Sequence, residues 1–265
     1  MDPFSMNKSN YSSFRNALRI LNLFSMDQPE LQLKDIMKEL GVGKSTAFRL
    51  VHSLTEEGFI IRDSSSKSYR LAASLLAKGQ TIIHTEDLCH LSLDVLENLA
   101  EKTHEAAHIS ILKDFRVLYL LKVDSAYPVH LLSHAGRQSP LHCTSSGQVL
   151  LAFQSDTMIR QVIEKGLTAF TANTITNSSK LEKVLEYIRI KGFAVCKEEH
   201  RKGITSIAGP VKNTQNEVIA SVSIAGPISR INDRTISNLT REVQQAADEI
   251  SRRLRESSSS KEKHL

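Results

Sequence analysis

The chain has 265 residues, of which 40% are hydrophobic, and its formal net charge is +5 at pH 7. A chain of this length exceeds one average domain and can bury sizeable cores, so we expect two globular domains. The surplus of positive charge is small, and residues 1–73 contain ten Lys or Arg against eight Asp or Glu. Binding to nucleic acid must therefore be argued from the placement of the charges and not from their total.

The apolar and cysteine patterns exclude membrane-spanning and disulfide-rich secreted classes. No apolar run approaches the length of about 18 residues that spans a bilayer, and no apolar export signal is present. Three widely separated cysteines, Cys89, Cys143 and Cys196, form no paired CxxC spacing that would suit zinc or redox chemistry. We expect reduced thiols, no cofactor and a cytoplasmic protein.

The first predicted elements are helices. Residues 14–24 carry apolar side chains at helical spacing, and Pro29 then stops the pattern. Residues 33–59 give two short amphipathic helices on either side of a turn at Gly41, which predicts a helix-turn-helix. The apolar positions of the three helices are Phe14, Ala17, Leu18, Leu21 and Phe24; Leu33, Ile36, Met37 and Leu40; and Ala47, Leu50, Val51 and Leu54.

The third of these helices presents a polar face that suits a DNA groove. At about 100° per residue, Ser45, Arg49 and His52 lie opposite its apolar stripe. Two short strands, 59–62 and 69–71, follow around a serine-rich tip and predict a β-hairpin, which completes a winged helix-turn-helix. The residues predicted to contact DNA are Lys44, Ser45, Thr46, Phe48, Arg49, His52, Arg62 and Lys67.

Two other interpretations of this segment are weaker. The letters GVGKST resemble the end of a phosphate-binding loop, but that motif needs a glycine where Lys38 stands and a buried strand before it. A helical hairpin without any ligand remains open on the periodicity alone.

From residue 75 onward the pattern predicts a linker helix and then an α+β domain, with a largely antiparallel sheet flanked by helices. The predicted helices are 75–83, 88–99, 145–153, 156–165, 181–191 and 236–254. The predicted strands are 108–111, 117–123, 129–133, 193–196, 204–208 and 218–224, with a loop over 135–140.

Two polar stretches of this domain could carry chemistry. The letters HEAAH match the HExxH motif of zinc peptidases, but the segment runs into a strand, where the residues would not share one helix face. A zinc hydrolase using His104, Glu105 and His108 is kept as the alternative function. At the start of the helix 145–153, hydroxyls and free backbone N–H groups would attract an anion, although capping by Thr144 or Ser145 explains the same residues.

In their order and spacing, short segments along nearly the whole chain resemble the IclR family of transcriptional regulators. They are NALRIL (16–21), GKSTAFRL (43–50), EGF (57–59), YRL (69–71), PLH (140–142), GQVLLA (147–152), GFAV (192–195), EEH (198–200), GI (203–204), IAGPV (207–211) and SIAGP (223–227). The resemblance implies an N-terminal winged helix that binds double-stranded operator DNA and a GAF-like C-terminal domain that binds a small effector. It also implies assembly as a homodimer or homotetramer.

We therefore expect a DNA-binding domain at 12–73, a linker helix at 74–87, an effector domain at 88–256 and a disordered tail at 257–265. The start of the helix near Ser145 favours a small organic anion, above all a carboxylate, as the effector. Cys196 stands where the family usually has Asp, and the neutral thiol, unlike an Asp carboxylate, would not repel such a ligand. No metal and no enzymatic activity are expected. The pocket that the resemblance implies consists of Val129, Leu132, Ser145, Ser146, Cys196, Ser206, Ser223 and Ala225.

Overall fold

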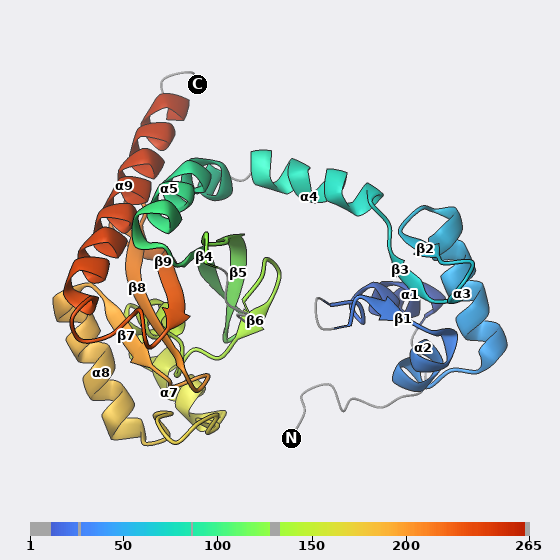
Figure 1. The fold of residues 1–265 in the computed structure, drawn as a ribbon, viewed down its shortest axis with the longest axis horizontal. Helices are drawn as coiled ribbons and strands as arrows, with labels where there is room; N and C mark the ends of the chain where they lie inside the picture. The colour runs from blue at the N-terminus through green and yellow to red at the C-terminus, as the bar shows by residue number, and fades with distance from the viewer. Residues whose placement is uncertain (1–11, 26–27, 86, 128–132, 263–265) are drawn as a thin grey trace. The chain divides into compact units, whose positions relative to one another are not determined.

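The structure is a computed structural model that describes residues 12–25, 28–85, 87–127 and 133–262. The chain divides into two compact units, Met1–Ile83 and His84–Leu265, whose elements are labelled in Figure 1. The division falls within helix α4 (Ser74–Thr85), which is the predicted linker helix.

The first unit combines three helices with a small sheet. The helices are α1 (Ser13–Leu21), α2 (Leu33–Leu40) and α3 (Lys44–Glu56). The strands β1 (Glu30–Leu31), β2 (Ile60–Arg62) and β3 (Tyr69–Leu71) form an antiparallel sheet in the order β1-β3-β2. The predicted helix-turn-helix and hairpin are confirmed. The sequence does not predict β1, because two residues are too few to show a period.

The turn between α2 and α3 depends on glycine. Gly41 ends α2 with φ of 67°, in the left-handed region that glycine adopts without steric penalty. The chain can then enter α3 with its apolar stripe facing inward, and Ala47, Leu50, Val51 and Leu54 are all buried, as predicted.

Helix α1 buries only part of the predicted stripe. Ala17, Leu21 and Phe24 pack in or against the core as predicted. Phe14 is 74% exposed and Leu18 is 47% exposed, and the core instead includes Ile20, which the sequence does not predict. In a helix of nine residues several overlapping apolar stripes fit the sequence, and packing against α2 and α3 decides between them.

One antiparallel sheet organises the second unit, and its described strands have the order β6-β5-β4-β9-β8-β7. Helices α5 (Asp87–Thr103) and α9 (Ile236–Glu262) pack on one face (Figure 1). Helix α6 (Ser145–Ala152) packs on the other face, against β8 and β9. The helices α7 (Asp156–Glu164) and α8 (Ser178–Lys191) lie against α6, which confirms the predicted α+β class. The strands are β4 (Ala106–Lys113), β5 (Arg116–Val123), β6 (Gln138–Ser139), β7 (Ala194–Lys197), β8 (Ile204–Lys212) and β9 (Val218–Pro227).

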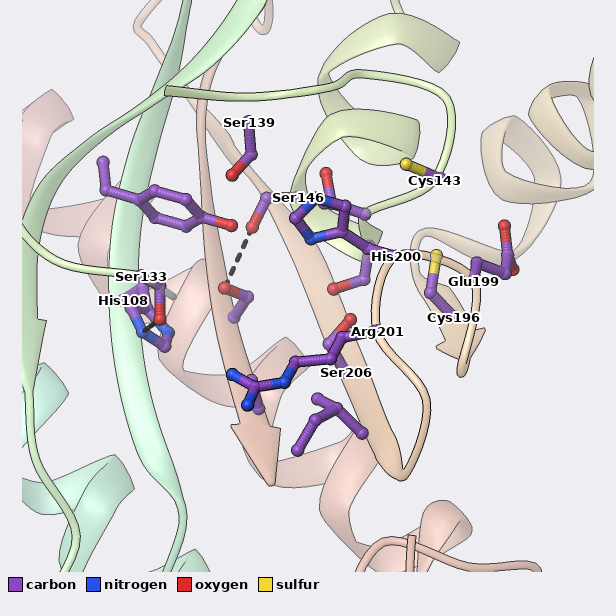
Figure 2. A pocket seen from close by; sticks show the side chains of 16 residues that line it. His108, Ser133, Ser139, Cys143, Ser146, Cys196, Glu199, His200, Arg201 and Ser206 are labelled. Carbon is purple, nitrogen blue, oxygen red and sulfur yellow. Dashed lines mark hydrogen bonds between the residues drawn. The ribbon is translucent and has the colours of Figure 1, made fainter. Parts of the chain in front are cut away.

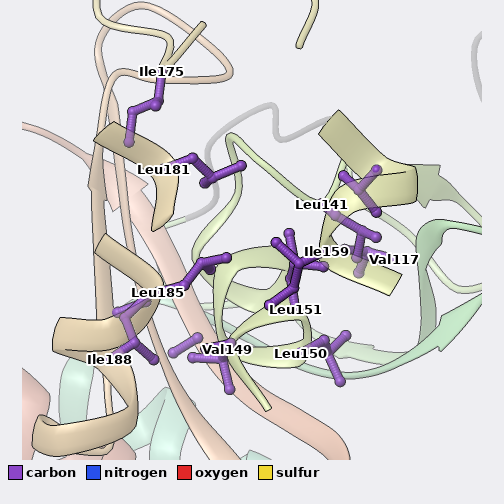
Figure 3. Close-up of a cluster of buried hydrophobic side chains, with 14 of the residues drawn as sticks. Val117, Leu141, Val149, Leu150, Leu151, Ile159, Ile175, Leu181, Leu185 and Ile188 are labelled. Carbon is purple, nitrogen blue, oxygen red and sulfur yellow. The ribbon is translucent and has the colours of Figure 1, made fainter. Parts of the chain in front are cut away.

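Helix α6 is buried along its whole length and lies at the centre of a hydrophobic cluster. Gly147 lets the start of α6 approach the preceding segment, because a Cβ at this position would overlap the backbone of Leu141. The beginning of α6 therefore lies directly against the segment that contains Leu141. Figure 3 shows the side chains that pack around it, among them Val149, Leu150, Leu151, Ile159, Leu181, Leu185 and Ile188.

Several boundaries differ from the prediction. Strands β8 and β9 extend beyond their predicted ends at 208 and 224, and β6 lies where the sequence indicates a loop. Helix α9 continues to Glu262, so residues 257–262 are helical and not a disordered tail, since extending a helix needs no new nucleation. Residues 129–132 of a predicted strand lie outside the described ranges. No helix in those ranges is both long and apolar enough to cross a membrane.

Candidate functional site

The outward face of α3 carries most of the residues predicted to contact DNA. Residues one helical turn apart, Ser45, Arg49 and His52, are exposed as predicted, and Thr46 is half-buried. Lys44 is exposed at the start of α3, and Phe48 is 50% exposed beside Arg49.

The β2–β3 hairpin carries the other two predicted contacts, both exposed. Arg62 ends β2, with its guanidinium 5.9 Å from the ring centre of Tyr69, and Lys67 lies in the turn with φ of 56°. The Asp63 carboxylate accepts hydrogen bonds from Ser65 and Ser66, and these hydrogen bonds hold its pKa far below the usual range. This local network defines the shape of the turn and fixes a negative charge between two cations.

A polar cavity of about 70 Å³ lies in the second unit, between the start of α6, the adjoining face of the sheet and the loop 198–203. Every described strand of that sheet contributes to its wall. Six of the eight residues of the predicted pocket line it, and the other two, Val129 and Leu132, lie outside the described ranges. The lining residues are His108, Tyr119, Ser133, Ser139, Cys143, Thr144, Ser145, Ser146, Cys196, Glu199, His200, Arg201, Ile204, Ser206, Ser223 and Ala225 (Figure 2).

The sheet register explains why residues far apart in sequence meet here. Cys196 pairs with Ser206, and Ser206 pairs with Ala225, so the three form a row across β7, β8 and β9. Ser223 lies two residues before Ala225 on β9, so its side chain points to the same face of the sheet, and it pairs with His108 of β4. The alternation of the strands therefore turns small polar residues toward α6.

The capping interpretation of the start of α6 is confirmed. Thr144 is the cap, since its Oγ1 accepts the N–H of Gly147 at 3.1 Å and donates to the carbonyl of Pro140 at 2.8 Å. The N–H groups of Ser145 and Ser146 belong to the first turn, where helix geometry supplies no acceptor. Ser146 also donates from its hydroxyl to Ser223 Oγ at 2.9 Å, which joins α6 to β9 (Figure 2).

The thiols and the carboxyl group of the cavity are shifted toward their neutral forms. Burial, with a contribution from the nearby Glu199, raises the pKa of the Cys143 thiol to about 12. The same causes raise the pKa of Cys196 well above its usual value. Glu199 accepts a hydrogen bond from Gln148 Nε2 at 2.8 Å, yet burial raises its pKa to about 7.

The histidines of the cavity favour their neutral forms as well. Burial lowers the pKa of His108 to about 3, and burial also lowers the pKa of His200. Arg201 keeps its positive charge, because a guanidinium does not deprotonate in proteins, and Figure 2 shows its side chain directed into the pocket. Arg201 therefore contributes a permanent positive charge to the lining.

The predicted pocket lacks several residues that line the cavity. Two sequence features indicate some of them: the alternation of the strand at 108–111 and the polar run 198–200. His108 lies on the cavity side of β4, and the alternation that predicts a strand over 108–111 could have placed it there. The run 198–200 follows the strand that ends beside Cys196, and Glu199 and His200 do face the cavity. Glu198 instead has a structural role, since its Oε1 accepts the N–H of Gly203 at 2.6 Å.

The structure contradicts a single-helix HExxH site. Helix α5 ends at Thr103, His104 has φ of 57°, and β4 begins at Ala106, so the two histidines lie on different elements. Glu105 is bound by Arg230 through two hydrogen bonds of 2.7 Å. In the described part of the chain, no group of three or more His, Cys, Asp or Glu is placed to hold a metal ion.

A chain that combines a winged helix-turn-helix unit with a separate unit containing a polar pocket is typical of ligand-responsive DNA-binding proteins. Comparisons with known proteins agree with this class. The model of the IclR helix-turn-helix domain matches residues 13–64, and the model of the bacterial transcriptional regulator IclR C-terminal domain matches residues 80–252. The transcriptional regulator XynR of Escherichia coli is 31% identical over 243 residues, which cover 91% of this chain and 96% of XynR.

Solved structures show the same fold. An IclR transcriptional regulator from Alicyclobacillus acidocaldarius has a TM-score of 0.83 and 28% identity, covering 92% of this chain and 99% of that one. An IclR homologue from Microbacterium hydrocarbonoxydans, complexed with 4-hydroxybenzoate, has a TM-score of 0.82 and 23% identity, covering 92% and 99%. The chain belongs to the IclR family of bacterial transcriptional regulators.

Proposed function

We propose that this regulator binds operator DNA through α3 and the β2–β3 hairpin and is controlled by a small organic anion bound in the cavity beside α6. The observation that carries the proposal is the presence on one chain of an exposed recognition helix and a polar, anion-favouring cavity in a separate unit. The effector changes operator affinity by the difference in its own affinity for the two forms of the protein. We assign no catalytic activity and place the protein in the cytoplasm with its DNA.

The size and charge of the cavity support a small acid. About 70 Å³ accommodates about five or six water-sized groups, the size of a short-chain carboxylate. Arg201 supplies positive charge, and the N–H groups of Ser145 and Ser146 supply the partial positive charge of a helix start. The fold is compatible with such ligands, since the Microbacterium regulator holds 4-hydroxybenzoate.

Specific DNA binding favours assembly of two copies, because one winged helix reads only a short half-site. Large apolar side chains that are open to solvent in the first unit support an association surface there. They are Phe14 and Leu18 on α1 and Leu76 on α4, which is 71% exposed.

Footprinting on the DNA upstream of the gene tests operator binding. We expect protection of two half-sites with centres about one helical turn, or a multiple of it, apart. Light scattering on the same preparation should report at least a dimer. Binding to this region no tighter than to an unrelated duplex of equal length would contradict the assignment of an operator there.

Calorimetry with matched ligand pairs tests the effector class. Each two-carbon to four-carbon carboxylic acid is compared with its neutral amide, and only the acid should bind. Ser145→Phe, which fills the cavity, should abolish the heat, whereas Ser179→Phe on the surface of α8 should not. Binding of the amides alone, or unchanged binding by Ser145→Phe, excludes an anion at the start of α6.

A further inference from the structure

Phe48 is a large apolar residue exposed on the surface of α3. The apolar residues of the helix are buried at Ala47, Leu50, Val51 and Leu54, but Phe48 lies outside this stripe and is 50% exposed. It does not belong to the core cluster of the first unit. A large aromatic ring is therefore presented to solvent at the edge of the predicted DNA-binding face, next to His52.

Neighbouring side chains hold this ring in place. The ring of His52, one turn further on, lies with its centre 6.0 Å from that of Phe48, at an interplanar angle of 48°. His52 is itself oriented by Glu56, whose Oε2 lies 3.1 Å from His52 Nδ1. A row of three contacting residues thus positions the Phe48 ring before any DNA arrives, which reduces the entropy lost on binding.

The chemistry of the major groove restricts what such a ring can meet. Base edges in that groove present hydrogen-bond donors and acceptors, and the 5-methyl group of thymine is their apolar feature. A phenyl ring placed against N7, O6 or an amino group would remove water from a polar atom and return no hydrogen bond. Against a thymine methyl group the ring buries apolar surface on both sides. Ser45 and Arg49, which are exposed on the same side of α3, can make the polar contacts to adjacent base pairs.

We propose that Phe48 is a specificity-determining residue that contacts the 5-methyl group of a thymine at a fixed position in each operator half-site. This inference rests on the proposed DNA-binding function of α3. It goes beyond that function because it assigns one base pair of the half-site as A·T, with the thymine methyl group toward Phe48. This pair lies next to the base pairs that Ser45 and Arg49 contact.

The test replaces thymine by uracil, which differs only in lacking the methyl group. Duplexes that the protein selects from a random pool give the half-site, and each of its thymines is then changed singly to deoxyuridine. For the native protein, one thymine per half-site should show a loss of affinity of about fourfold, the factor expected for one buried methyl-sized group. Changes at the other thymines should have little effect.

The variant Phe48→Ala should bind the thymine duplex more weakly and show no further loss with uracil at that position. Arg49→Ala is the matched control, because it should weaken binding overall while keeping the fourfold loss at the same thymine. Thermal unfolding of both variants should match that of the native chain, since both side chains lie at the surface.

The outcomes distinguish the role of Phe48 from operator binding by α3. Selection of a defined sequence without any uracil effect overturns the role of Phe48 and leaves operator binding intact. A uracil effect that persists in Phe48→Ala assigns the methyl contact to another residue and also overturns it. Failure to enrich any sequence from the pool overturns operator binding by α3, and the inference with it.

Discussion

Arg230 holds the carboxylate of Glu105 with two hydrogen bonds, Nε to Oε1 and Nη2 to Oε2, each 2.7 Å long. Glu105 is 1% exposed and immediately precedes β4, whereas Arg230 follows β9. Gly226 leaves the space that the carboxylate occupies, because a Cβ there would overlap it. The pair therefore fastens β4 to β9 next to Ala225, a residue of the cavity wall.

Removing Arg230 should destabilise the second unit. The variant Arg230→Met leaves a buried carboxylate without its cation, and we expect a loss of about 3 kcal/mol in the free energy of unfolding, the low end for breaking a buried pair. The low end applies because Arg230 is partly exposed. Urea unfolding followed by circular dichroism measures the loss. Arg252→Met on the surface of α9 is the control and should show no measurable change, and an equally small effect for Arg230→Met would contradict the stabilising role.

Adding one methyl group to α6 should disrupt it. In an open helix Gly→Ala is favourable by about 1 kcal/mol, but at Gly147 the new Cβ would overlap the backbone of Leu141. We expect Gly147→Ala to cost about 1 to 3 kcal/mol and to weaken effector binding, since the start of α6 must move. Gly79→Ala in α4 is the matched control, because no atom lies within 4 Å of its Cβ, and it should be neutral or stabilising. Equal effects of both changes would show that the Leu141 contact is not decisive.

Glu199 should make stability fall as the pH rises. Its pKa is about 7 in the folded chain because of burial, against a model-peptide value of 4.5. Between these two values the folded state holds a proton that the unfolded state has released, so each increase in pH favours unfolding. Above about pH 7 the whole penalty is present. Glu199→Gln, which keeps an acceptor for Gln148, should remove it.

The comparison that isolates Glu199 is the difference between the variant and the native chain at each pH. His108 titrates with the opposite sign, because its lowered pKa of about 3 makes stability rise with pH up to about 6.5. This contribution cancels in the difference. The two pH units between 5 and 7 correspond to about 3 kcal/mol, so we expect the Tm of Glu199→Gln relative to the native chain to rise by about 5 to 11 °C between pH 5 and about pH 8. A difference that is constant over this range would show that Glu199 is not perturbed.

Local sequence patterns predict the first unit well because its contacts are local. The stripes of α2 and α3 and the hairpin depend on residues a few positions apart, and Gly41 marks the turn between them. The stripe of α1 is the exception: whether Phe14 or Ile20 faces inward depends on the other helices.

The second unit is harder to predict because its site depends on long-range register. Glu105 and Arg230 are 125 positions apart, and Ser146 and Ser223 are 77 apart, so no periodicity links them. The resemblance to the IclR family implies six of the cavity residues, whereas Tyr119 and Arg201 follow only from the folded sheet and the loop 198–203. A short motif also misleads where its context is absent, as HEAAH does across the end of α5.

Base contacts and phosphate contacts on α3 and the hairpin should separate in their dependence on sequence and salt. Arg49 is exposed at the centre of the outward face, so Arg49→Ala should weaken operator binding by about 10-fold to 100-fold and affect random DNA much less. Lys44→Ala and Lys67→Ala should weaken binding to both kinds of DNA alike. Each should also reduce the slope of log K against log salt concentration by about 1, since one fewer phosphate is neutralised.

Fluorescence anisotropy on an operator duplex and a scrambled duplex, each at several salt concentrations, measures both quantities. Lys183→Ala is the control for the loss of one positive charge, because Lys183 is exposed on α8 in the second unit. It should leave both affinity and slope unchanged. If Arg49→Ala lowers affinity for the two duplexes by the same factor and changes the slope, Arg49 neutralises a phosphate. Sequence reading would then have to come from Phe48, Ser45 and His52.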